Sequence, residues 1–165
     1  MKRMVLVGAA FMAVIPLAAA FASVSDQDVT IPPIPAVPIP AGVGNVTFSP
    51  VAMRDLDIVD ARVVSVLEGS PWDLHVGVLS TGHGFYVHGS RRMSNHIPGR
   101  AADVSKIGGV AVSAANPTAR EFVRWLTTLN PPPDEVGSPF AEFESVPGFF
   151  TDGDHMGHVH LGWDG

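Results

Sequence analysis

The sequence predicts an α+β domain, in which a small antiparallel sheet carries flanking helices. Three observations predict this class. Residues 72–79 alternate between apolar and mostly polar or small side chains, as in a strand that is buried chiefly on one face. Residues 60–67 and the segment that follows Asn116 have the start and stop signals of helices. Seventeen glycines and fifteen prolines supply turns between short elements.

Composition excludes several classes of protein. Hydrophobic residues make up 46% of the 165 residues and charged residues 16%, which is too apolar for a disordered chain. Cysteine is absent, which excludes disulfides, thiolate zinc clusters and cysteine nucleophiles. The net charge of −6 argues against a nucleic-acid partner, for which a basic surface is expected. This length predicts one domain.

Residues 1–22 have the features of a signal peptide. Lys2 and Arg3 precede an apolar run, residues 4–22, which ends in the small-x-small sequence Ala-Phe-Ala. The run is nineteen residues long, enough for a helix to span a bilayer, so an uncleaved anchor is the alternative and would be the sole contact with a membrane. An internal proline and the alanine-rich end favour cleavage after Ala22. We therefore expect an exported protein, secreted or held in the cell envelope.

Residues 23–44 are expected to form a proline-rich linker. Five prolines fall in nine positions of this segment, and each fixes φ and removes a backbone donor, which predicts an extended polyproline II conformation. The segment is either a ligand for a proline-binding partner or a spacer, and we favour the spacer. The folded domain is then expected over residues 45–165.

The first half of this domain is expected to hold one short helix and short strands. Residues 60–67 predict the helix, and Gly69 closes it. After the strand at residues 72–79, a glycine-rich turn at residues 81–84 leads to a second short strand at residues 85–88.

The second half begins with a predicted hairpin. Residues 101–104 are a third strand candidate, and two glycines break the chain before a hairpin arm at residues 110–112. The clearest helix follows, because Asn116 is a good N-cap and Pro117 fits the first helical position. Its apolar stripe is Phe122, Val123, Trp125, Leu126 and Leu129. Three prolines stop it, and residues 158–163 predict a final strand.

Some of the seven histidines carry no functional signal. His75 is expected to be a packed or exposed strand residue, and His83 and His88 flank a glycine turn as surface residues. His96 lies in a different context. It precedes Asp103 by seven positions with a Pro-Gly turn between them, so the two side chains can converge when the segments fold back on each other.

This pairing suggests a metal site. Zinc accepts imidazole nitrogen and carboxylate oxygen, and a catalytic zinc site needs three such ligands plus water. The third ligand comes from His158 or His160, because alternation along a strand points both to the same face. One of the pair binds the metal and the other faces the attacking water. Each of these residues, taken alone, could be an ordinary turn or strand residue without a metal. The spacing of the whole set favours a zinc site.

The same residues resemble a known family. The pattern is Ser94-x-His96-x-x-Gly99-x-Ala101-x-Asp103, followed late in the chain by His158-x-His160. It resembles the signature of the M15-type zinc D-Ala-D-Ala metallopeptidases, which share a fold with the hedgehog signalling domain, and is close to that of exported actinobacterial members. The resemblance extends less sharply over residues 60–163. It implies a hedgehog/DD-peptidase-like fold, Zn²⁺ bound by His96, Asp103 and His160, His158 as the catalytic residue, and cleavage of peptidoglycan stem peptides.

The sequence departs from the family pattern at two places. Many members place a glutamate general base three residues before the last histidine ligand, where this chain has Gly157; the family's HxH variants instead keep a histidine at the position of His158. Many members also have a Ser-Gly-x-Arg segment whose arginine grips the substrate carboxylate. The corresponding residues 80–83 contain no arginine. The first departure leaves the identity of the catalytic base open, and the second leaves carboxypeptidase specificity open.

Five further residues are candidates for supporting roles. Arg91 or Arg92 is a candidate to replace the missing arginine. The alternative is that both are solvated surface charges. Ser94 of the signature is grouped with them as a substrate-binding candidate. Asp154 and His155 are candidates to orient a ligand histidine through its second nitrogen, or else loop and surface residues.

Three functions follow from these observations. The leading hypothesis is an exported zinc peptidase acting on peptidoglycan stem peptides, as a D-Ala-D-Ala carboxypeptidase or an endopeptidase. The second is a non-catalytic zinc-containing binding module of the cell envelope. The third, a structural protein without a metal, agrees least with the histidine pattern.

Overall fold

The computed structural model describes Gly42 and residues 44–165. The signal peptide predicted over residues 1–22 and nearly all of the linker predicted over residues 23–44 lie outside the described residues, and both stay predictions. Within the described part, none of the helices combines the length and apolar character that crossing a bilayer requires.

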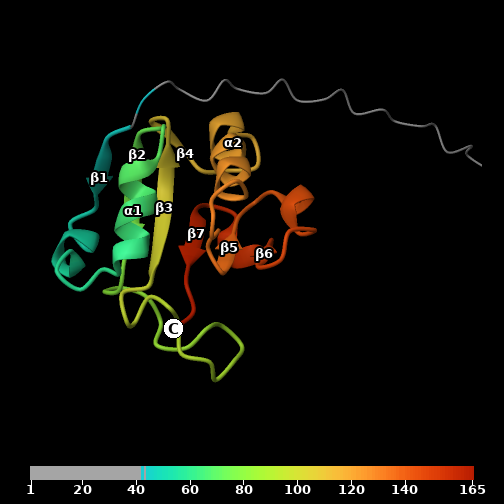
Figure 1. Ribbon diagram of the computed structural model, residues 1–165. Coiled ribbons are helices and arrows are strands. Elements are labelled where there is room, and N and C mark those ends of the chain that lie inside the picture. The colour runs from blue at the N-terminus through green and yellow to red at the C-terminus, as the bar shows by residue number, and fades with distance from the viewer. Residues whose placement is uncertain (1–41, 43) are drawn as a thin grey trace, which may run out of the picture. The chain divides into compact units, whose positions relative to one another are not determined.

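Over the described residues the fold is a mixed seven-stranded sheet with two α-helices (Figure 1). The strand order is β1-β2-β3-β7-β5-β6, and β4 pairs with β3 off this path. The strands are β1 (Val46–Phe48), β2 (Leu74–Val78), β3 (Ala101–Ile107), β4 (Val110–Ala111), β5 (Glu135–Gly137), β6 (Phe149–Phe150) and β7 (Val159–Gly162). The α-helices are α1 (Ala61–Gly69) and α2 (Pro117–Leu126), and the 3₁₀ helices are η1 (Ala52–Asp55), η2 (Ala141–Phe143) and η3 (Gly153–His155).

The predicted combination of strands and helices is confirmed, but the purely antiparallel sheet is wrong. The central strands β2, β3, β7 and β5 are antiparallel to their neighbours in that order, whereas β1 is parallel to β2 and β5 is parallel to β6. The reason lies in the connections. The chain between β1 and β2 passes through η1 and α1, and the chain between β5 and β6 passes through η2. Such long connections return a strand in the same direction.

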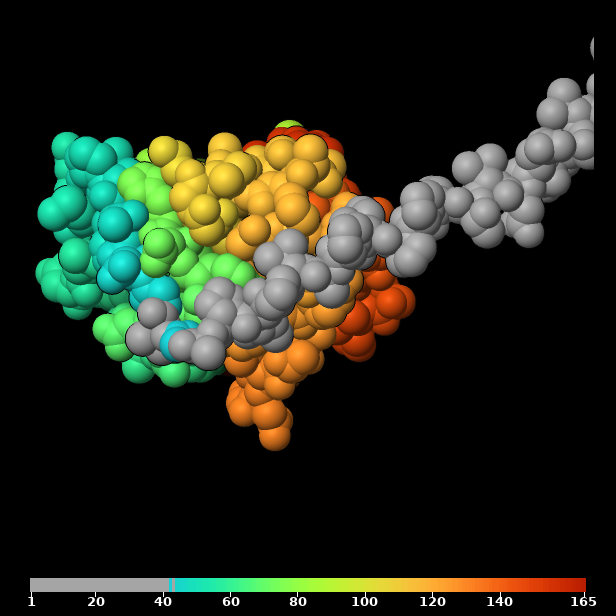
Figure 2. Space-filling model, turned by 90° about the horizontal axis from the view of Figure 1, so that it is seen from above, coloured from blue at the N-terminus to red at the C-terminus, as the bar shows by residue number. Residues whose placement is uncertain are grey.

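Both predicted helices are present, and each begins after a side-chain cap, which the sequence predicts for Asn116. The Asp60 side chain accepts a hydrogen bond from the Arg62 backbone N–H at 2.9 Å, and α1 runs to Gly69, two residues past the predicted end. The Asn116 side chain accepts from the Ala119 backbone N–H at 3.1 Å, with Pro117 at the first helical position. Figure 2 shows the β3–β4 turn beside the start of α2, where the Asn116 amide also donates to the Val110 and Ala111 carbonyls.

One predicted strand is wrong. Residues 85–88 form no strand, and Tyr86 makes a single bridge to Met93. The side chains of Phe85 and Tyr86 are exposed, so no apolar burial stabilises an extended pairing there. The strands predicted at residues 72–79, 101–104, 110–112 and 158–163 are present with somewhat different ends.

The centre of the sheet is the most deeply buried part. On β3 the side chains from Ala101 to Val104 are buried, and on β7 all four residues are buried. Trp72 packs edge-on against Phe122 of α2, with ring centroids 6.1 Å apart. A charged residue in the middle of these strands must therefore be paired or bind a cation. This condition applies to Asp103, in β3.

Candidate metal centre

Strand pairing brings two of the predicted ligands together. In the antiparallel pair of β3 and β7, Asp103 lies directly opposite His160. Directly opposed residues present their side chains on the same face of a sheet. Asp103 Oδ1 lies 3.0 Å from His160 Nδ1.

The third predicted ligand comes from the long connection between β2 and β3. A turn at its end, in which the Gly99 N–H donates to the His96 carbonyl at 3.0 Å, returns the chain towards β3. Gly99 has φ +74°, and a Cβ there would lie 2.2 Å from the Ile58 carbonyl oxygen, so this position requires glycine. The fully buried His96 ring places Nε2 3.1 Å from both Asp103 Oδ1 and His160 Nδ1. The structure thus brings His96, Asp103 and His160 to one point.

The outer nitrogens of both histidines are hydrogen-bonded. His96 Nδ1 bonds the Leu79 carbonyl, and His160 Nε2 lies 3.4 Å from Glu135 Oε1. Because a neutral imidazole has one N–H, donation outward leaves the inner nitrogen with a lone pair. In that neutral form two lone pairs and a carboxylate oxygen face one another, an arrangement that a metal ion or a proton between them stabilises.

This donor set fits zinc. Tetrahedral ligands about 2.0–2.1 Å from zinc lie about 3.3 Å apart, close to the 3.0–3.1 Å separations among these three atoms. Outward hydrogen bonds from ligand histidines to a carbonyl or carboxylate are a regular feature of metal sites.

Electrostatics favour an ionised Asp103. Burial raises the pKa of the Asp103 carboxyl. The hydrogen bonds from His160 and His96 lower it by a larger amount, so the pKa is well below its usual range. Burial lowers the pKa of His160, whereas its hydrogen bonds to Asp103 and Glu135 raise it to about 9. A proton and a metal ion compete for the same His160 nitrogen.

His158 lies beside this set. It immediately precedes β7 and is half-buried, and its Nε2 lies 3.5 Å from Asp103 Oδ1. Burial lowers the pKa of His158, partly offset by the nearby Asp103 carboxylate. A neutral imidazole at this position can accept a proton near neutral pH. The structure therefore places His160 within the set of three donor atoms and His158 at its edge.

His83 was missed as a site residue, and the expectation that it lies on the surface is wrong. Its half-buried ring stacks on that of His96, with centroids 4.0 Å apart and planes 16° apart. Among the described residues, His83, His96 and Asp103 offer ligand atoms within 4.8 Å of one another and could hold a metal ion. The available signal was its place in residues 80–83, the stretch that corresponds to the family's carboxylate-binding segment.

Glu135 was also missed. Its carboxylate accepts from Arg92 and from Asn95, each at 2.7 Å, besides facing His160. Burial raises the pKa of Glu135, but the bonds from His160 and Arg92 outweigh this and bring it to about 2. No sequence pattern marks this residue, since only the pairing of β5 with β7 brings it beside His160.

Of the predicted substrate-binding residues, Arg92 and Ser94 line the site pocket and Arg91 does not. Arg92 is paired with Glu135 and with Asp164, at 3.6 Å, whereas Arg91 is exposed and is not among the residues that line the site pocket. Ser94 is buried, and its hydroxyl accepts from the His96 backbone N–H at 3.3 Å.

Asp154 and His155 of η3 were the candidates to orient a ligand histidine. Asp154 contacts the exposed His88 at 2.7 Å, so its hydrogen-bond partner is not a ligand histidine. His155 bonds Asp152 at 2.6 Å, and its ring lies 5.0 Å from that of His158. His155 therefore contacts the site through packing against His158.

A pocket of about 760 Å³ opens over the candidate ligands. Its walls come from the β2–β3 connection, from η3 and from β7, and include His83, Tyr86, Arg92, Asp103, His158 and His160. Figure 1 shows the β2–β3 connection extending beyond the sheet on the side where the C-terminus lies. The site is thus accessible to a substrate larger than water.

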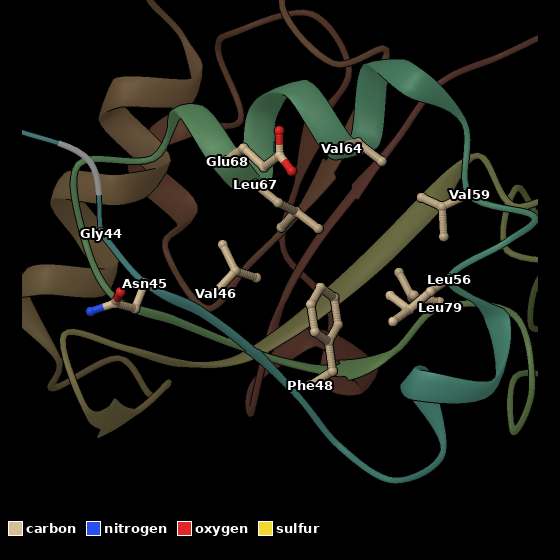
Figure 3. A pocket seen from close by; sticks show the side chains of 10 residues that line it. All are labelled: Gly44, Asn45, Val46, Phe48, Leu56, Val59, Val64, Leu67, Glu68 and Leu79. Atoms are coloured by element: carbon tan, nitrogen blue, oxygen red, sulfur yellow. The ribbon is translucent and has the colours of Figure 1, made fainter.

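A second cavity, of about 480 Å³, lies between β1 and α1 (Figure 3). The side chains of Phe48, Leu56 and Leu67 point into it together with other aliphatic groups. Among its lining residues Glu68 carries the titratable group. These lining residues form no metal-binding set, so the candidate metal site lies in the pocket over Asp103.

We expect Glu135→Gln to weaken zinc binding about 10- to 100-fold, because the outer carboxylate that orients His160 is replaced by a neutral amide of the same shape. Competition with a chromophoric chelator measures this. Glu144→Gln, at an exposed glutamate, is the control. Equal zinc affinities for the two variants would contradict a role of Glu135 in the site.

Comparison with known proteins returns no match among family models, curated proteins or solved structures. The resemblance to zinc D-Ala-D-Ala metallopeptidases therefore rests on the motif residues quoted above. The geometry adds that His96, Asp103 and His160, widely separated in sequence, meet at one point.

Proposed function

We propose that the chain is an exported zinc-dependent peptidase with a hedgehog/DD-peptidase-like fold, which hydrolyses peptide bonds in peptidoglycan stem peptides. One observation carries this proposal: His96 Nε2, Asp103 Oδ1 and His160 Nδ1 converge within 3.1 Å at a pocket that also contains His158. The donor types, their order in the sequence and their spacing are those of the family signature.

Each residue has a role that follows from its surroundings. His96, Asp103 and His160 hold the metal, while the Leu79 carbonyl and Glu135 fix the orientation of the two imidazoles. When bound, zinc polarises the scissile carbonyl and lowers the pKa of the attacking water towards about 7. His158, which lines the pocket, would accept the proton of the attacking water, hydrogen-bond the developing oxyanion in its protonated form, and pass the proton to the amine nitrogen as the C–N bond breaks.

The arginines bear on the mode of cleavage. Arg92 is the arginine among the residues that line the pocket, and two carboxylates already neutralise it. A free C-terminal carboxylate on the substrate therefore finds no unpaired guanidinium in this lining. This favours cleavage of an internal bond of the stem peptide over removal of the terminal D-alanine.

One observation favours a second candidate, a non-catalytic zinc module that binds stem peptides. Gly157 stands where many family members have the glutamate general base, and a Cβ added there would have no atom within 4 Å. Among the described residues, no side chain other than those of the chain neighbours therefore lies within 4 Å of that point. The two candidates differ in whether His158 alone supports turnover.

Digestion of muropeptides by the purified full chain tests the proposal. The zinc-loaded protein is incubated with muropeptides between about pH 5 and about pH 9, and products are identified by mass spectrometry. We expect cleavage that a chelator abolishes and added zinc restores. Fully zinc-loaded protein that binds muropeptides without cutting them would replace the peptidase with the binding module.

A further inference from the structure

We infer that His83 is a fourth protein ligand of the metal, so that the resting centre contains three histidines and one aspartate and is closed to water. The inference rests on the proposed zinc site and concerns how access to that site is controlled. Four protein ligands characterise closed zinc centres, whereas catalytic centres keep one position open. Substrate must therefore displace His83 before the metal can take part in chemistry.

The first support is the position of the ring. The imidazoles of His83 and His96 stack almost in parallel with centroids 4.0 Å apart, and ligand atoms of His83, His96 and Asp103 lie within 4.8 Å of one another. A metal ion lies in the plane of each imidazole that binds it, so the His83 ring must turn out of the parallel stack for its Nε2 to reach an ion held by His96 and Asp103. His83 is thus beside the donor set, on the side of the pocket.

The second support is its hydrogen bonding. His83 Nδ1 lies 2.9 Å from the Gly84 carbonyl oxygen, so this nitrogen carries the hydrogen and Nε2 keeps a lone pair. The same arrangement holds for His96, which bonds the Leu79 carbonyl, and for His160, which bonds Glu135. In each of the three imidazoles one nitrogen is thus held by an outer acceptor, as in metal-ligating histidines. The inner nitrogens of His96 and His160 face Asp103, and Nε2 of neutral His83 keeps its lone pair.

The third support is the anchoring of the loop. Asp55, a buried carboxylate of η1, accepts from the backbone N–H groups of Ser80 and Thr81 at 3.0 and 2.7 Å and from the Thr81 hydroxyl at 2.7 Å. These three bonds fix the chain two residues before His83. Burying a carboxylate is costly unless it is hydrogen-bonded, and here the bonds hold the loop that presents His83 at the site.

X-ray absorption at the zinc edge of the zinc-loaded full chain tests the inference, because outer-shell scattering counts the imidazoles bound to the metal. We expect three imidazoles in the wild type and in His158→Ala, and two in His83→Ala, with zinc affinity weakened about tenfold or more in His83→Ala. His75→Ala removes a histidine that bonds Thr47 outside the site and is expected to keep three.

The possible results separate this inference from the proposed function. Two imidazoles in the wild type, unchanged in His83→Ala, would overturn the role of His83 and leave the three-ligand site intact. A third imidazole lost in His158→Ala, and not in His83→Ala, would also overturn it. Wild-type protein that binds no zinc would overturn both the inference and the proposed metal site. The count in the wild type does not depend on how any variant folds.

Discussion

Alanine at His96, Asp103 or His160 is expected to weaken zinc binding roughly 100-fold. Structural zinc sites bind with about 10–16 kcal/mol, so an even share for one of four coordination positions is about 3 kcal/mol, which corresponds to about two orders of magnitude in the dissociation constant. The measurement is zinc content by mass spectrometry after dialysis, together with affinity by chelator competition. The three variants are expected to behave alike, because their donor atoms meet at a single point.

Two controls accompany this prediction. His75→Ala removes an imidazole elsewhere on β2 and is expected to keep its zinc. Circular dichroism shows whether each variant remains folded, which matters for the fully buried His96. Folded His96→Ala or Asp103→Ala with wild-type zinc affinity would contradict the assigned site.

The second large effect is expected at His158. His158→Ala is expected to lower the rate of stem-peptide cleavage at least about tenfold while zinc content stays at the wild-type level, because general acid–base help is worth about 10²–10⁴-fold. The proposed roles differ because the two side chains differ in position: His160 is buried with Nδ1 3.0 Å from Asp103 Oδ1, whereas Nε2 of half-buried His158 lies 3.5 Å from the same oxygen. Initial rates and zinc content are measured on the same samples.

The reverse result is informative. If His158→Ala lost its zinc while His160→Ala kept it, the roles within the pair would be exchanged. If His158→Ala kept both zinc and full activity, the proton acceptor would lie elsewhere in the pocket.

The helices and most strands were predictable because their signals are local. Asp60 and Asn116 mark helix starts through side-chain caps that depend on residues within three positions. The parallel edges of the sheet were not predictable in the same way. Strand direction depends on where a long connection returns the chain, and the sequence within β1 or β6 contains no information on this.

The residues of the candidate site also divide into those with a local sequence signal and those without one. His96 and Asp103 were recognisable because they lie on either side of a short turn. Strand alternation left His158 and His160 as alternatives, and only the family resemblance favoured His160 as the ligand. His83 and Glu135 reach the site through distant contacts: Asp55 fixes the loop before His83, and the pairing of β5 with β7 brings Glu135 to His160. Neither contact has a counterpart in local sequence.

The most direct test of the metal centre is a crystal structure of the zinc-soaked chain with anomalous diffraction recorded on both sides of the zinc absorption edge. We predict one strong zinc peak among His96 Nε2, Asp103 Oδ1 and His160 Nδ1, at about 2.0–2.2 Å from each atom. A zinc peak bound by other residues, or the absence of a peak at these three atoms in crystals soaked to saturation, would contradict the account.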